Sequence, residues 1–182
     1  MRLPSAAFPL LLALSLLSAG CSPTFNWREH RMPPTPLQGL LPCRPDEAVR
    51  TVTLGDGPVE MRMAGCEAGG ATFAIAYVRA DPARLGALLG RWQDATLANL
   101  GHAPGPDAPA GRAFVPPGAL ALPQSVRIAA DGRGADGAPV SARAVWFAGG
   151  DAGATYAFQA VVYAPHPADE AADAFFAALR LR

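Results

Sequence analysis

The stretch that decides the fold is residues 58–82, PVEMRMAGCEAGGATFAIAYVRADP. Residues 59–63 alternate apolar and polar side chains, as a half-buried strand does. Gly69-Gly70 predicts a turn into a second strand at residues 72–78, and so short a connection requires an antiparallel hairpin. Asp81-Pro82 then predicts the start of a helix, because Asp can cap free N–H groups and Pro fits the first helical position.

The rest of the chain follows the same plan of strands and then a helix. The helix after Asp81 should run to about Leu100 and bury Trp92, and a second helix should open at Pro167 and close the chain. Further strands are expected at residues 37–41, 49–54, 112–115, 125–130, 140–148 and 154–163. Strands then a helix, twice over, predict an α+β fold with two helices packed against a mostly antiparallel sheet.

Composition limits the kinds of partner. The 182 residues are 51% hydrophobic, which suits one globular domain with a core. Fifteen acidic side chains balance fifteen basic ones, so nucleic acid is not expected as a partner. All fifteen basic residues are Arg, and a chain without Lys has no Schiff-base or Lys general-base chemistry.

The first 21 residues have the pattern of an export signal. Arg2 precedes an apolar run at residues 8–17, which is shorter than the roughly 20 residues that span a bilayer as a helix. Ser18-Ala19-Gly20-Cys21 resembles the bacterial lipobox, in which the cysteine is lipidated and becomes the new N-terminus. An ordinary signal peptide is the alternative, because small residues at 18 and 20 also suit that peptidase.

The lipobox resemblance implies a signal peptide at residues 1–20, lipidation of Cys21 and a domain that faces the periplasm. In lipoproteins, the absence of Asp after the cysteine, where this chain has Ser22, favours the outer membrane over the inner. Residues 21–36 contain four prolines and are expected to form a tether. Phe25 and Trp27 favour a short edge strand docked on the domain instead, or a surface for a partner. Residues 37–182 should form a single α+β domain.

The layout also resembles a known family. A proline-flanked first strand, the V-x-M-x-M strand, the Gly-Gly hairpin, the Asp-Pro helix start and a closing Phe-Phe-x-x-Leu-Arg-Leu helix are similar to PsbP-like α/β/α sandwich domains. The resemblance spans roughly residues 37–182 and implies accessory, non-enzymatic roles. The chain also resembles uncharacterised lipoproteins of GC-rich proteobacteria.

Cys43 and Cys66 are the cysteines that remain if Cys21 is lipidated. An exported protein with an even pair is expected to form a disulfide. Two free, buried thiols are the alternative. A redox-active pair is less expected, because no Cys-x-x-Cys stands at a helix start.

The sequence contains no recognisable catalytic or metal-binding motif. His30, His102 and His166 lack the paired spacing of a zinc site, and no G-x-S-x-G elbow or phosphate-binding loop is present. No metal or cofactor is therefore expected. Met61, Met63, Phe73 and Trp92 could line a pocket between sheet and helix, or form an ordinary core.

Three functional hypotheses follow, of which the third is an unrecognised hydrolase that a polar cluster in a deep cleft or a strongly shifted carboxylate would support. The first is a non-enzymatic, lipid-anchored accessory protein that contacts other envelope proteins. The second is a periplasmic module that binds a small molecule or lipid.

Overall fold

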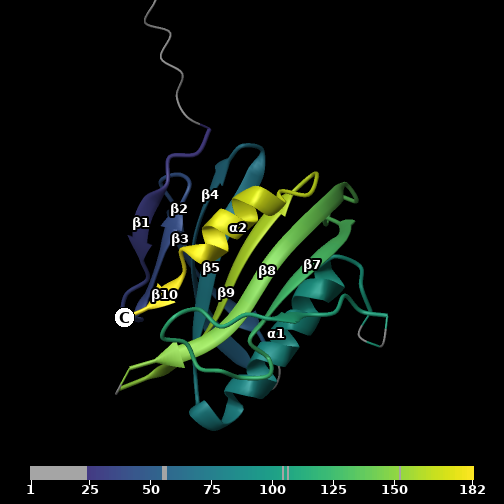
Figure 1. The fold of residues 1–182 in the computed structure, drawn as a ribbon. Coiled ribbons are helices and arrows are strands. Elements are labelled where there is room, and N and C mark those ends of the chain that lie inside the picture. Colours follow the sequence, from purple (N-terminus) through teal and green to yellow (C-terminus); the bar gives the residue numbers. More distant parts are fainter. Residues whose placement is uncertain (1–23, 55–56, 104, 106, 152) are drawn as a thin grey trace, which may run out of the picture.

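A seven-stranded antiparallel sheet dominates the computed structural model, which describes residues 24–54, 57–103, 105, 107–151 and 153–182. The signal peptide expected at residues 1–20 and Cys21 lie outside the described residues. The order of the strands is β3-β4-β5-β9-β8-β7-β6, and each neighbouring pair is antiparallel (Figure 1). Their bounds are β3 (Asp46–Thr53), β4 (Pro58–Ala68), β5 (Ala71–Ala80), β6 (Arg112–Ala113), β7 (Val126–Arg133), β8 (Pro139–Gly150) and β9 (Thr155–Ala164).

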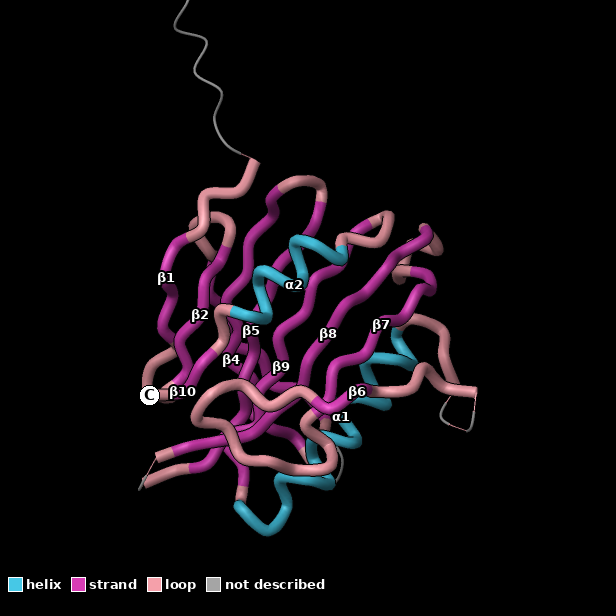
Figure 2. Tube along the Cα trace, in the orientation of Figure 1, coloured by secondary structure: helices cyan, strands magenta, loops and turns pink. Residues whose placement is uncertain are grey.

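A smaller antiparallel sheet stands beside the first. It has the order β1-β2-β10, with bounds β1 (Arg28–Arg31), β2 (Leu37–Leu41) and β10 (Arg180–Leu181). The helical elements are the 3₁₀ turn η1 (Pro82–Arg84), α1 (Leu85–Asn99) and α2 (Asp169–Ala177) (Figure 2). The α+β class and the mostly antiparallel sheet are thus confirmed.

The expected strand at residues 37–41 forms and pairs with β1 and β10 in the small sheet. One expectation about the C-terminal end was wrong. The closing segment is not helical to its end, because α2 stops at Ala177 and the next backbone groups find other partners. The Leu181 N–H donates to the Pro117 carbonyl at 2.8 Å, and the Arg182 N–H donates to the Pro36 carbonyl at 3.0 Å.

The predicted capping of the helix by Asp81 is confirmed, but the first turn of the helix differs from the prediction. The Asp81 carboxylate accepts a hydrogen bond from the Ala83 N–H at 2.8 Å. Residues 82–84 form a 3₁₀ turn, and the α-helix begins only at Leu85. Proline at the first position and tight capping favour such a turn at a helix N-terminus.

Alternate residues of β5 belong to two different core clusters. Phe73, Ile75 and Tyr77 lie in the first, which also contains Phe175 and Phe176 of α2. In a strand, successive side chains point to opposite faces of the sheet, so the intervening residues of β5 must lie on the other side.

The second cluster occupies that other side and contains Ala76 and Val78 of β5. Leu89 and Trp92 of α1 belong to it and are 0% and 4% exposed. A buried hydrogen bond also joins α1 to the sheet: Gln159 Nε2 of β9 donates to Thr96 Oγ1 at 2.9 Å.

The expected disulfide between Cys43 and Cys66 is present, with the two Cα atoms 5.9 Å apart. It links the loop after β2 to β4, and hence the small sheet to the large one. Cys66 lies inside β4 because that strand continues beyond Met63 to Ala68. The bond therefore fixes one end of the molecule across two sheets.

Replacing both Cys43 and Cys66 by Ser should lower the free energy of unfolding by about 3 kcal/mol, because the bond closes a loop of 23 residues in the unfolded chain. Urea denaturation of the wild type and the double variant measures the difference. Reductant should weaken the wild type and leave the double variant unchanged. Equal stability of the two proteins under oxidising conditions would contradict the structural role.

Candidate functional site

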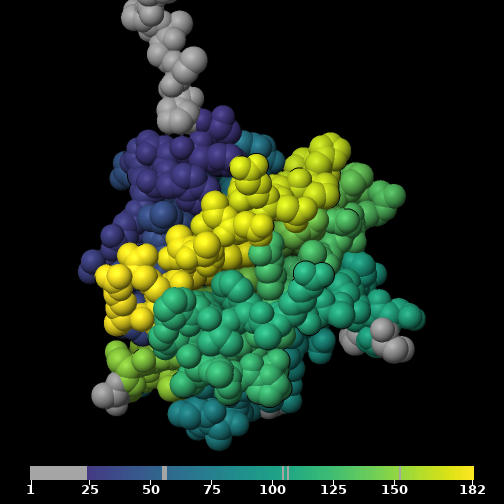
Figure 3. All heavy atoms as spheres, in the orientation of Figure 1, coloured from purple at the N-terminus to yellow at the C-terminus, as the bar shows by residue number. Residues whose placement is uncertain are grey.

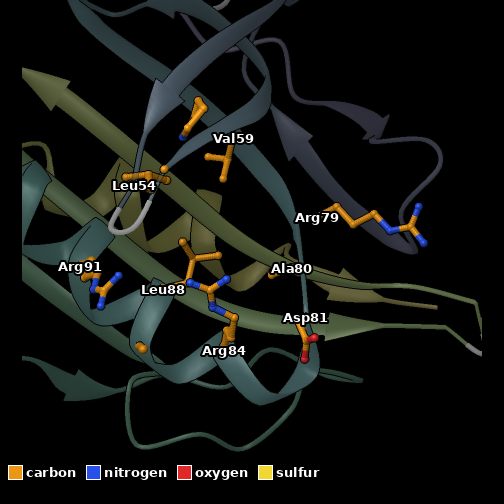
Figure 4. A pocket seen from close by; sticks show the side chains of 11 residues that line it. Leu54, Val59, Arg79, Ala80, Asp81, Arg84, Leu88 and Arg91 are labelled. Carbon is orange, nitrogen blue, oxygen red and sulfur yellow. The ribbon is translucent and has the colours of Figure 1, made fainter.

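A pocket of about 250 Å³ opens between the β3–β4 hairpin and the start of α1 (Figure 4). It lies at the end of the sheet where β4 begins and β5 ends. The lining residues are Leu54, Gly57, Pro58, Val59, Arg79, Ala80, Asp81, Arg84, Ala87, Leu88 and Arg91.

Local structure explains how the helical side of the pocket is built. Asp81 caps η1 and thereby starts the helix directly after β5. Arg84, Leu88 and Arg91 follow at intervals of four and three residues, which places them on one face of a helix. Figure 4 shows Leu88 facing Leu54 and Val59 across the pocket.

The pocket has an apolar part and a cationic edge. Its apolar part is made by Leu54, Val59 and Leu88, and Arg84 and Arg91 stand at its edge. Both arginines also have interaction partners within the protein. Among the described lining residues there is no Ser, Cys or His, and the one carboxylate, Asp81, already caps a helix. The described lining therefore holds no nucleophile with a general base beside it.

Arg79 differs from the other two arginines. Figure 4 shows its side chain extending away from Arg84 and Arg91. It also borders a second, more open hollow of about 470 Å³ on the other face of the sheet, which is lined by Pro34, Val59, Glu60, Arg62, Tyr77, Arg79 and Tyr156. Arg79 therefore stands at the sheet end between two concave surfaces.

The structure does not bring together the four residues considered for a pocket. Met61 and Trp92 are buried in the second core cluster, and Met63 packs against it. Phe73 is fully buried in the first cluster, on the opposite face of the sheet. The cause is the β4–β5 register, which sets Met61 opposite Val78 and Phe73 opposite Cys66. One cavity beneath α1 cannot be lined by all four side chains.

A polar cluster that the sequence did not reveal joins β7, β8 and α2. Arg143, 8% exposed, donates hydrogen bonds to Asp169 Oδ1 and to Ser141 Oγ, the latter at 2.8 Å. Ser141 Oγ in turn donates to Asp131 Oδ1 at 2.7 Å. His102 Nε2 contacts the Asp131 backbone carbonyl at 2.9 Å rather than the serine. The serine therefore has a carboxylate partner but lacks the His contact that activates a nucleophile.

The pKa values of the cluster also favour a structural role. Hydrogen bonds from Ser141 and then Arg143 lower the pKa of Asp131. A hydrogen bond from Arg143 lowers the pKa of Asp169. Both carboxylates are thus held as anions, whereas a general acid or base working near neutrality needs a pKa close to the working pH. We interpret the cluster as a cross-link between α2 and the sheet.

The described histidines lie far apart in the fold. His30 Nε2 lies 3.9 Å from Glu47 Oε1, and His166 is exposed in the loop before α2. Over residues 24–182, leaving out the five undescribed positions, no group of three or more His, Cys, Asp or Glu could hold a metal ion. No helix in the described part of the chain is long and apolar enough to cross a membrane.

Comparison with known proteins identifies no relative: no family model, curated protein or solved structure matches the chain. Function must therefore be inferred from the residues of the chain itself. The helical spacing of the pocket residues Arg84, Leu88 and Arg91 can be recognised in the sequence. The sequence gives no sign that the β3–β4 hairpin covers these residues.

The lowered pKa values of Asp131 and Asp169 predict a specific dependence of stability on pH. Their contribution is present above the ordinary carboxyl pKa of about 3.8 and is lost as the pH falls through the lowered folded-state values. Replacing both residues by Asn should therefore flatten the loss of unfolding free energy between about pH 5 and pH 2. Urea denaturation of the wild type and the double variant across this pH range measures the change in the free energy of unfolding.

Asp94→Asn is the matched control, because Asp94 is an exposed aspartate of α1 outside the cluster. This variant should keep the acid sensitivity of the wild type. An acid dependence of the double variant that matches the wild type would show that the cluster does not stabilise the fold through its charges.

Proposed function

We propose that this protein is a lipoprotein of the bacterial cell envelope, anchored through lipidated Cys21, whose domain faces the periplasm. The observation that carries the proposal is the sequence Ser18-Ala19-Gly20-Cys21 directly after an apolar run. The Cys43–Cys66 disulfide supports export, because such bonds persist in oxidising compartments. Ser22 after the cysteine favours attachment to the outer membrane.

We further propose that the domain is a PsbP-like α/β/α sandwich with a non-enzymatic, accessory role toward other envelope proteins. The two core clusters on opposite faces of one sheet, each with residues from one helix, support this layout. The pocket lining, which holds no nucleophile with a base, and the anionic Asp131 and Asp169 support a non-enzymatic role.

A second candidate is a module that binds a small molecule. The pocket beneath the β3–β4 hairpin supports it, because an apolar floor with guanidinium groups at the edge suits a small amphiphile with an anionic group. At about 250 Å³ the pocket is smaller than most sites for drug-sized ligands. Its ligand would be a small acid rather than a whole phospholipid.

Replacing Cys21 by Ala should abolish lipidation and leave either an unprocessed precursor or a soluble product. Metabolic labelling with radioactive palmitate and fractionation of membranes from soluble proteins measure both effects. A variant with Ser at Cys43 and Cys66 is the matched control, because it keeps Cys21 and should still incorporate the label. Membrane retention of a cleaved Cys21→Ala protein would contradict the anchor.

Crosslinking of the tagged protein in its own envelope, followed by mass spectrometry, separates the two roles. A reproducible envelope-protein partner supports the accessory role.

A small molecule released on denaturation supports the second candidate, provided that the Leu88→Trp variant, whose indole fills the pocket, no longer carries that molecule. Leu120→Trp is the control, because Leu120 is 44% exposed and lies outside the pocket. Retention of the molecule by Leu88→Trp would exclude this pocket as its site.

A further inference from the structure

The proposed lipid anchor lies very close to the folded domain. The first described residue is Thr24, three residues after Cys21. Three residue steps of a fully extended chain cover at most about 11 Å. If Cys21 carries the lipid, Thr24 is held within about that distance of the bilayer surface.

The chain contacts the domain from Phe25 onward. The rings of Phe25 and Trp27 each lie 6.0 Å from the ring of Phe73 in edge-on contact. The Asn26 N–H donates to the Pro42 carbonyl at 2.8 Å. Figure 3 shows the purple N-terminal part of the chain lying beside the yellow C-terminal part. Residues 25–27 are therefore held against the domain and do not act as a free spacer between Thr24 and the core.

The β4–β5 turn lies at the same end of the molecule, as Figure 1 shows. Gly69 has a φ of +60°, and a Cβ built on it would come within 2.8 Å of Phe25 Cζ. The Cys43–Cys66 disulfide braces this end as well. We call residues 24–27 together with the turn at residues 68–71 the base of the domain.

The base has the character of a surface that can touch lipid headgroups. The turn sequence Ala68-Gly69-Gly70-Ala71 carries no charged side chain. Trp27 and Phe25 are half-buried and present part of their rings to the surface, and aromatic residues are enriched at membrane interfaces.

The pocket lies at the other end of the same strand. β4 runs from Pro58, which lines the pocket, to Ala68 in the base. Ten residue steps at about 3.3 Å each separate the two ends by roughly 33 Å. Figure 1 likewise shows α1 starting at the end opposite the β4–β5 turn.

We propose that the base rests on the leaflet that holds the anchor and that the pocket end points away from it into the aqueous compartment. This inference depends on the lipid anchor proposed above. The partner of the base is the headgroup region of the bilayer. The short distance in sequence between Cys21 and Thr24 and the docked pair Phe25 and Trp27 together restrict rotation of the domain relative to the bilayer.

The absence of lysine from the chain makes a sharp test possible, because one engineered Lys is a unique side-chain amine. Glu67→Lys places it beside the base, and Arg79→Lys places it at the pocket end; both positions are exposed. The lipidated mature protein is labelled with an amine-reactive donor dye and reconstituted in vesicles that carry acceptor-labelled headgroups. The unsubstituted protein measures any labelling elsewhere.

Energy transfer should be several-fold more efficient from residue 67 than from residue 79. A ten-residue Gly/Ser insertion after Ser22 adds a flexible leash of about 17 Å and should reduce that difference. Equal transfer from both positions in membrane-bound protein would overturn the orientation while the anchor stands. Protein that fails to stay with the vesicles would instead overturn the anchor.

Discussion

The central strands β5, β9 and β8 are buried on both faces, and the rest of the structure depends on this constraint. A strand covered on both sides needs apolar residues at nearly every position, and their sizes must suit two different neighbours. Toward α1 the sheet presents many small side chains, namely Ala76, Ala142, Ala144, Ala148 and Ala157. The opposite face carries large aromatic side chains, including Phe73, Tyr77, Phe147, Tyr156 and Phe158. The alanine face gives Trp92 and Leu89 of α1 room to approach, whereas ring contacts such as Phe147 on Phe158, 5.1 Å between centroids, fill the other face.

The aromatic face also determines how the N-terminal segment is held. Phe73 contacts Phe25 and Trp27 on one side and Phe175 of α2 on the other, the last at 5.6 Å. Ordering the first residues of a chain costs conformational entropy, and burial of two aromatic rings offsets that cost. The same residue thus joins the N-terminal segment, the middle of the sheet and the last helix. In the proposed lipoprotein, a pull on the anchor would act on the core itself.

Local patterns predicted local structure well, and failures began where distant segments meet. The alternation at residues 59–63, the Gly-Gly turn and the capping by Asp81 each depend on neighbours in sequence, and each is present. The pairing of β2 with β10 joins residues some 140 positions apart, and no short motif encodes it. The apolar run of β5 gives no sign of which residues face which side, because both sides are buried. The sequence pattern therefore does not separate Phe73 from Met61 and Trp92, which the register places on the other face. Arg143 could not be recognised as the centre of a polar cluster, because its partners come from three elements.

The positions of the N-terminal segment and the pocket at opposite ends of β4 bear on which ligands are physically accessible. With the base on the leaflet, a lipid from that leaflet would have to leave the bilayer and travel the length of the strand to reach Leu88. Extracting an acyl chain into water costs about 0.8 kcal/mol per CH₂ group, so this route is closed to long chains. A water-soluble anion or the surface of another envelope protein meets no such barrier. The proposed orientation therefore favours partners that arrive from the aqueous side, and under it the proposed accessory role and the small-acid pocket are compatible in one molecule.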